Sequence, residues 1–267
     1  MHIKDHFKNI QPKLKYKNRI AWAGNIPFFS SVDREYKALF KYTKMKYAEQ
    51  MLNLGRFRIG TLYEYQGMEI AEIGDRYEGF RGYQTNPEVP IAPQLDTLIK
   101  HVRYLEPVRN YPAFNKHPIG MPVQIDVIAP DMYLLCFTRN FDREAMTRFG
   151  YDACIEISNP TGFLHSLNEA MLPYAYSGCI NTCHYSDRII QINDNSVPPP
   201  QSIKGREFEH QQEVRLVWDP LPLKNLWRKD NLPVLKDYEF GPSSKPALNA
   251  PIILECPDAA KYCKLIF

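Results

Sequence analysis

The alternation of apolar and polar positions is most regular between residues 38 and 65. Residues 38–43 (ALFKYT) form a short apolar run typical of a strand, and residues 44–55 (KMKYAEQMLNLG) carry apolar side chains at helical spacing. Gly55 closes that run, and glycine favours a helix end because it enters the left-handed conformation without a steric penalty. Residues 56–65 (RFRIGTLYEY) alternate like a half-buried strand. The pattern therefore predicts strand, helix and strand in immediate succession.

Strand-like patterns dominate the later part of the chain. One further helix is predicted at residues 162–172 (GFLHSLNEAML), where apolar residues again recur at helical spacing. Because strands outnumber helices and strand–helix alternation is not sustained, we expect an α+β fold with a mostly antiparallel β-sheet core and flanking helices. The further predicted strands are residues 132–138, 151–157, 178–187, 209–218 and 251–257.

The remaining stretches define the expected domain organisation. Residues 1–30 are interpreted as a basic N-terminal arm. Residues 66–130 are polar and rich in proline, which is typical of an elaborated loop region that lies over a site. Residues 31–267 are interpreted as a single domain, because a chain of this length can bury one large core.

Composition narrows the class of protein. No window of about 18 residues is apolar throughout, so a membrane span is not expected. The N-terminus is basic but lacks the apolar stretch of a secretory signal, which favours a cytoplasmic protein with reduced thiols. Cys179, Cys183 and His184 (CINTCH) have the residue types of a zinc site, but no second pair with ligand spacing follows. No bound metal is therefore predicted.

The segment FEHQQEVRLVW (208–218) carries the strongest candidate chemistry. On a strand, side chains two residues apart share a face, so Gln211 and Glu213 would project together. A carboxylate on the inner half of a sheet is costly unless it is solvated or used. Glu213 could form a surface pair with Arg215 on an edge strand, or it could face positive charge that develops in a cleft. The apolar side chains expected to face the core are Val214, Leu216 and Trp218.

Two of these segments resemble ADP-ribosyltransferases. Gln211–Glu213 resembles their [Q/E]-x-E element, and residues 39–65 resemble their opening, in which a first strand with a basic residue and a threonine precedes a helix that ends in glycine. With GDRYEGF (74–80) and YLLCFT, the chain is similar to a bacterial branch found in phage-defence genes and toxin–antitoxin modules. That branch includes messenger-RNA-modifying toxins of toxin–antitoxin–chaperone systems. Lys41 stands where arginine or histidine is usual.

The resemblance implies a split sheet, NAD as the co-substrate and no metal. Glu213 would be the catalytic carboxylate, which holds a ribose hydroxyl and steadies the positive charge that develops as nicotinamide leaves. Gln211 would orient the acceptor. No G-x-G-x-x-G run is present, so NAD would not lie in a Rossmann domain. The residues expected to contact NAD are Lys41, Tyr42, Thr43, Thr61, Tyr63, Tyr77, Phe137 and Thr138.

Within that set, the chemistry of each side chain suggests its role. Lys41 or Thr43 would hold a phosphate or a ribose, with lysine acting as a point charge. Tyr63 or Tyr77 would offer a face on which nicotinamide stacks. The alternative interpretation for each tyrosine is a core residue that does not contact NAD.

The acceptor is expected to be nucleic acid, RNA ahead of DNA. Residues 1–19 interleave lysines with aromatic residues, as in an arm that tracks phosphates and stacks bases, although a solvated tail has the same composition. Further basic residues near the presumed cleft are Lys44, Lys46, Arg56 and Arg58. A free toxin of this kind would also need an antitoxin protein as a partner.

Other functions remain open at this point. The enzyme could transfer ADP-ribose to protein, or hydrolyse NAD. A metal-dependent nuclease could use Asp152, Glu156 and Glu213. A degenerate transferase fold could also serve as a non-catalytic binding or sensing module.

Overall fold

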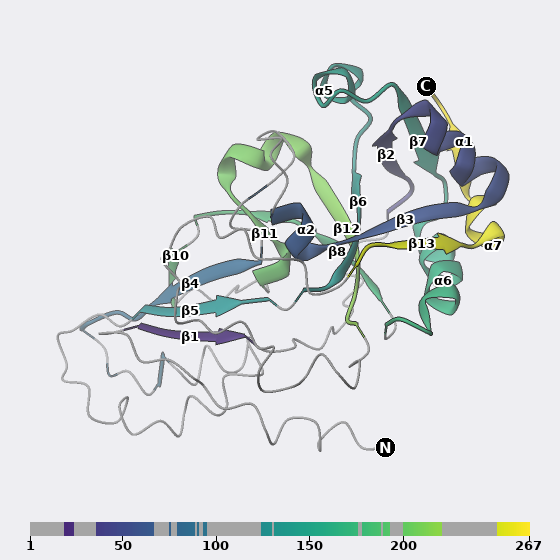
Figure 1. Cartoon of the computed structure of the whole chain (residues 1–267). Coiled ribbons are helices and arrows are strands. Elements are labelled where there is room, and N and C mark those ends of the chain that lie inside the picture. Colours follow the sequence, from purple (N-terminus) through teal and green to yellow (C-terminus); the bar gives the residue numbers. More distant parts are fainter. Residues whose placement is uncertain are drawn as a thin grey trace.

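The structure, a computed structural model, describes residues 19–23, 36–66, 75, 79–88, 90, 93–94, 124–129, 131–175, 178–187, 189–192, 200–220 and 250–267. The protein belongs to the α+β class, with a mostly antiparallel eight-stranded sheet and a few short helices (Figure 1). The expected fold class is confirmed at this level. None of the described helices has the length and apolar character needed to cross a bilayer.

The large sheet has the strand order β13-β3-β6-β2-β7-β14, and β12 extends it by pairing with β6 and with β8. Its ladders are antiparallel. Between β2 and β6 the register has a single pair, Phe40 opposite Thr138. The strand bounds are β2 Leu39–Thr43, β3 Arg56–Thr61, β6 Tyr133–Thr138, β7 Ala153–Ile157, β8 Cys179–Thr182, β12 Glu213–Trp218, β13 Ile252–Glu255 and β14 Cys263–Leu265.

The predicted helix end at Gly55 is confirmed. Helix α1 (Met45–Leu54) is capped by Gly55 in the left-handed conformation, at φ 61°. A Cβ at Gly55 would come within 2.6 Å of the backbone nitrogen of Pro257, so the close approach of α7 (Pro257–Ala260) also requires glycine. Other α-helices within the described ranges are α2 (Leu62–Gln66), α5 (Arg143–Arg148) and α6 (Pro160–Met171).

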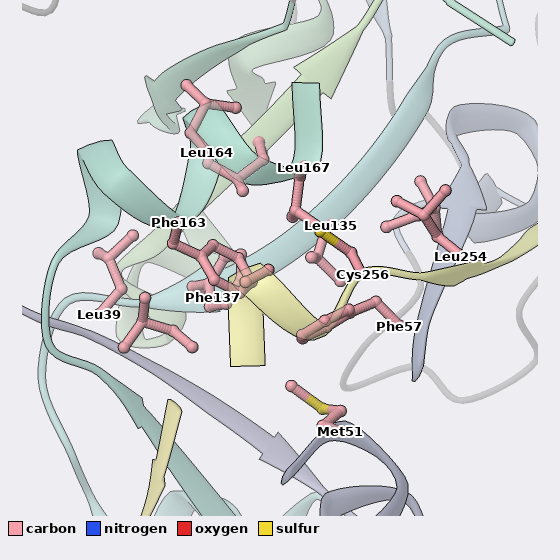
Figure 2. Close-up of a cluster of buried hydrophobic side chains, with 14 of the residues drawn as sticks. Leu39, Met51, Phe57, Leu135, Phe137, Phe163, Leu164, Leu167, Leu254 and Cys256 are labelled. Carbon is pink, nitrogen blue, oxygen red and sulfur yellow. The ribbon is translucent and has the colours of Figure 1, made fainter. Parts of the chain in front are cut away.

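The larger apolar cluster lies on one face of the large sheet, beneath α1, α6 and α7. Figure 2 shows Phe163, Leu164 and Leu167 of α6 lying over the side chains of β6. The ring of Phe163 packs edge-on against Phe57 and Phe137, with centroids 5.4 and 5.9 Å apart. The expected core residues of β12 are confirmed, since Val214, Leu216 and Trp218 all belong to this cluster.

A second, four-stranded sheet lies beside the first, in the order β1-β5-β4-β10 (Figure 1). It consists of β1 (Arg19–Ala23), β4 (Phe80–Gln84), β5 (Gln124–Ile128) and β10 (Ile189–Gln191). Strand β1 thus falls within the stretch interpreted as an arm, and β4 and β5 fall within the stretch interpreted as a loop region. These strands are short, and β1 pairs in parallel with a strand about a hundred residues away. A short strand whose partner is distant in the sequence has too few residues to show a clear alternation of apolar and polar positions.

Asp219, directly after β12, makes fold stability depend on pH. Its Oδ1 is buried without a hydrogen-bond partner among the described residues, and burial raises the pKa of this carboxyl from 3.8 to about 7. The unfolded chain releases this proton near pH 4, so the folded state binds more protons between about pH 4 and 7. The stability that this group contributes is therefore complete below pH 4 and lost as the pH rises through 7.

We expect Asp219→Asn to raise the free energy of unfolding at pH 7.5 by up to about 4 kcal/mol and to leave it little changed below pH 4. Urea denaturation of both proteins at several pH values between 4 and 7.5 measures this. If both lose the same stability over this range, the assignment to Asp219 is wrong.

Candidate functional site

A pocket lies where the single pair between β2 and β6 meets the start of β12. Glu213 is the cross-strand neighbour of Thr138, and Thr138 is in turn opposite Phe40. Cross-strand neighbours project to the same face of a sheet, so these side chains come together. The pocket is lined by Phe40, Lys41, Tyr42, Tyr65, Cys136, Phe137, Thr138, Phe149, Tyr151, Lys204, Gln211 and Glu213.

The volume of the pocket is about 120 Å³. Pockets that enclose a whole drug-sized ligand usually measure roughly 300–1,000 Å³. The space between the described residues therefore suits one chemical group of the size of an aromatic ring or a phosphoryl group.

Glu213 is held between two buried cations. The Nζ of Lys204, on β11 (Ile203–Lys204), donates to its Oε2 at 2.5 Å, and the Nε of Arg215 donates to its Oε1 at 2.6 Å. All three side chains are at least nine-tenths buried. Breaking a buried pair by removing one partner is strongly destabilising, so this arrangement fixes the carboxylate in one orientation.

Further hydrogen bonds orient the two cations. Nζ of Lys204 also donates to Oε1 of Gln211 at 2.6 Å, and a guanidinium nitrogen of Arg215 donates to the carbonyl of Gln201 at 2.6 Å. The backbone N–H of Glu213 donates to the hydroxyl of Tyr185 at 2.6 Å. The side chains around the carboxylate are thus fixed by their own partners.

Lys41 reaches the pocket from β2, whereas Glu213 reaches it from β12. Its Nζ donates to the carbonyl of Cys136 at 3.2 Å and lies 5.6 Å from the centre of the Phe137 ring. The ammonium of Lys41 thus binds a backbone carbonyl of β6 two residues before Thr138, which forms the single pair with β2. Burial lowers the pKa of Lys41, although nearby negative groups, Glu213 among them, oppose the shift.

Burial and neighbouring charges shift the pKa of several groups at this site. Burial opposes the charge of Lys204, but Glu213 together with Cys183 and Cys136 outweighs burial, so the pKa of Lys204 lies above its usual value. Burial lowers the pKa of Arg215 to about 9, which leaves the guanidinium charged at neutral pH. Burial raises the pKa of Cys136 and of Tyr65 well above their usual values, so both stay neutral. Lys204 and Arg215 therefore flank the carboxylate of Glu213, and Lys41 and Lys204 line the same pocket.

The structure brings six of the candidate residues to this pocket: Lys41, Tyr42, Phe137, Thr138, Gln211 and Glu213. Tyr77 lies outside the residues that the structure describes. The other three candidates, Thr43, Thr61 and Tyr63, are buried and do not line the pocket.

Those three residues have other contacts. Thr43 is the partner of Ala153 in the β2–β7 ladder. The hydroxyl of Tyr63 donates to the carbonyl of Ala129 at 3.0 Å, in a second apolar cluster. Oγ1 of Thr61 accepts from the N–H of Glu64 at 3.2 Å. Their contacts support the fold rather than the pocket.

The predicted strand through residue 65 is wrong after Thr61, and this error misplaced the tyrosine. Thr61 and Glu64 form a reciprocal cap, because the N–H of Thr61 also donates to Oε2 of Glu64 at 3.4 Å. The cap starts α2, which turns Tyr63 into the protein and leaves Tyr65 at the pocket. The T-x-x-E spacing at residues 61–64 is a helix-start signal that would have found Tyr65.

The expected strand alternation of Gln211 and Glu213 is also wrong, although both side chains reach the pocket. Gln211 ends a 3₁₀ helix, η3 (Arg206–Gln211), and Gln212 then takes the left-handed conformation at φ 45°. The side-chain amide of Asn140 donates to Oε1 of Gln212 at 2.7 Å. The two candidates therefore meet at the ammonium of Lys204, not on one face of a strand.

The candidate nuclease acids are not brought together. Oδ1 of Asp152 accepts from the N–H of Met45 at 2.7 Å, and Glu156 lies on β7 opposite Phe40. Within the described ranges, no three His, Cys, Asp or Glu side chains are grouped to hold a metal ion. Cys179 and Cys183 are buried free thiols.

Two of the basic residues expected near the cleft are paired with acids. Arg56 binds Glu255 at 2.8 Å, and Arg58 binds Glu64. Lys44 donates to the carbonyl of Gly150, and Lys46 lies over the ring of Tyr47. Residues 1–18 of the basic arm lie outside the described residues.

Comparisons of the chain with protein-family models, with curated proteins and with solved structures found no match.

Proposed function

We propose that the chain is an NAD-dependent ADP-ribosyltransferase with Glu213 as its catalytic carboxylate. The observation that carries the proposal is that Lys41, Tyr65 and Glu213, from three separate elements, line one pocket. A cation, an aromatic ring and a carboxylate are the groups that a dinucleotide and its cleavage require. The single pair between β2 and β6 supports the split form of sheet that the resemblance implies.

Two lysines at the pocket favour an anionic ligand. The ammonium groups of Lys41 and Lys204 both line it, and lysine binds phosphate as a point charge. The pyrophosphate of NAD carries the negative charge that such groups bind. Tyr65 supplies a ring for stacking nicotinamide in place of the expected Tyr63.

The proposed reaction exchanges one bond for another at the anomeric carbon of the nicotinamide-bearing ribose. The bond to the ring nitrogen breaks, and nicotinamide leaves with the electron pair. A lone pair of the acceptor forms the new bond, and the acceptor loses its proton to solvent. Positive charge develops on the ribose meanwhile, and a fixed carboxylate stabilises it.

Glu213 has the fixed orientation that this role needs. Lys204 and Arg215 each hold one of its oxygens, so little reorganisation is required during the reaction. Gln211 shares the ammonium of Lys204 and is placed to orient the acceptor.

The same two contacts favour a second function. Both oxygens of Glu213 already accept from buried cations. In this second function, Glu213, Lys204 and Arg215 stabilise the fold, and the pocket binds an anionic ligand without catalysing a reaction. Binding of ADP-ribose with no release of nicotinamide would favour this binding module over the enzyme.

Incubation with NAD labelled in its adenylate part, with and without cell lysate, tests the proposal. We expect release of nicotinamide and label in macromolecules, without added metal. Separate digestion with protease, RNase and DNase then identifies the acceptor, which we propose is RNA. Absence of nicotinamide release in every condition would overturn the enzymatic function.

Lys41→Ala is expected to raise the KM for NAD by about tenfold while it lowers kcat less. A contact to phosphate stabilises ground and transition states alike, so its loss weakens binding more than turnover. Steady-state kinetics of nicotinamide release measure both constants. Lys46→Ala, at an exposed lysine over Tyr47, is the matched control and should change neither. A lower kcat with an unchanged KM would remove Lys41 from the phosphate site.

The biological role follows from the resemblance alone. We propose a cytoplasmic toxin of a toxin–antitoxin or phage-defence system, restrained by an antitoxin protein. Growth arrest on expression of the wild-type chain but not of a Glu213→Gln variant would test this role.

A further inference from the structure

A row of aromatic rings leads out of the pocket. We define the aromatic rim as Phe40, Tyr42, Phe141, Phe149, His210 and Phe267. Phe141 lies 6.3 Å from Phe40, 6.2 Å from Tyr42 and 6.5 Å from Phe267, between ring centroids. Tyr42 lies 6.4 Å from Phe149, which in turn lies 6.0 Å from His210. The rings are therefore in one continuous series.

The outer rings are exposed, although solvent does not favour exposed phenyl rings. Phe141 and Phe267 each keep 37% of their surface accessible. Neighbouring exposed aromatic side chains on a surface mark a binding site more often than isolated ones do. The rim is also continuous with the pocket, because Phe40, Tyr42 and Phe149 line both.

Guanidinium groups accompany the rings. Arg143 lies 4.2 Å above the centre of the Phe267 ring, and Arg148 lies 5.8 Å from that of Phe149. Two nearby carboxylates accept hydrogen bonds from backbone N–H groups: Asp142 caps the start of α5, and Asp152 accepts from Met45. Glu144, on the same helix as the arginines, is exposed. The rim thus combines ring faces with cations at close range.

We propose that the aromatic rim binds a single-stranded polynucleotide, whose bases stack on Phe141 and its neighbours and whose phosphates contact Arg143 and Arg148. Aromatic platforms interleaved with cations are how proteins hold single strands. The proposal deepens the proposed function, because a strand on the rim would present a base to the ribose in the pocket. Binding itself does not require the transferase activity.

The test measures binding and turnover separately. Fluorescence anisotropy with a labelled single-stranded RNA is compared for the wild type, Phe141→Ala and Arg143→Gln. We expect Phe141→Ala to weaken binding by about tenfold, and Arg143→Gln to reduce the salt dependence of binding. Tyr174→Ala is the matched control, because this tyrosine is 44% exposed and lies in the turn after α6. Circular dichroism confirms that each variant is folded.

Each outcome has one meaning. Weaker RNA binding by Phe141→Ala with unchanged NAD hydrolysis supports the rim as the acceptor surface. Equal affinity of the wild type and both rim variants overturns it, as does tighter binding of duplex DNA than of a single strand. Loss of NAD binding in Phe141→Ala also overturns it, because the rim would then hold the adenosine end of NAD. Failure of the wild type to release nicotinamide rejects the transferase but leaves the RNA-binding result intact.

Discussion

Glu213→Gln is expected to slow ADP-ribose transfer by about 100- to 1,000-fold at saturating NAD. Glutamine keeps the volume of the side chain but lacks the charge that stabilises the developing positive ribose, a contribution of roughly 3–4 kcal/mol in comparable sites. Release of nicotinamide in single-turnover experiments measures the effect. Retention of more than about a tenth of wild-type activity would show that Glu213 is not catalytic.

The same substitution weakens the fold. Lys204 and Arg215 lose their common anion, and loss of one partner from such a buried cluster costs about 3–5 kcal/mol. Activity must therefore be compared well below the melting temperature of the variant. Glu213→Asp keeps the charge on a shorter stem, so it should remain more stable and still lose activity. Glu255→Gln, in the exposed pair with Arg56, is the matched control for both measurements.

Lys204→Met is expected to lower transfer by about 10- to 100-fold, because catalysis needs both side chains that this lysine holds in place. The ammonium holds Oε2 of Glu213 and Oε1 of Gln211, so its loss releases both side chains. The rate of nicotinamide release at saturating NAD measures the effect.

Lys204→Arg keeps the charge and should restore most of the wild-type rate. Lys264→Met, at an exposed position on β14, is the matched control. A Lys204→Met variant that transfers ADP-ribose at the wild-type rate would show that Lys204 does not position Glu213 for the reaction.

The parts of the fold that sequence reasoning anticipates are those that local patterns determine. Gly55 ends α1 because no other residue fits both its left-handed backbone and its approach to Pro257. Trp218 and Leu216 face the core because strand alternation leaves one face for apolar residues. Both conclusions need only a few neighbouring residues.

The pocket is harder to predict from the sequence, because its lining residues are far apart in the chain, from Phe40 to Glu213. Lys204 has no neighbouring spacing that signals a role, and it reaches Glu213 only because β11 pairs with β9 (His184–Tyr185). Tyr65 was missed for a different reason. The alternation of RFRIGTLYEY continues past Thr61 and favours a strand. The reciprocal hydrogen bonds between Thr61 and Glu64 instead end the strand at Thr61 and start α2.

The one-residue junction between β2 and β6 has a consequence for motion. It divides the large sheet into two hydrogen-bonded blocks: β2, β7 and β14 form one, while β3, β6, β8, β12 and β13 form the other. Few backbone hydrogen bonds resist a small shear between them. Lys41 belongs to the first block and Glu213 to the second, so a ligand that contacts both would act as a clamp. Hydrogen exchange at the junction, near Phe40 and Thr138, should then slow when the ligand binds, while exchange inside each block changes little.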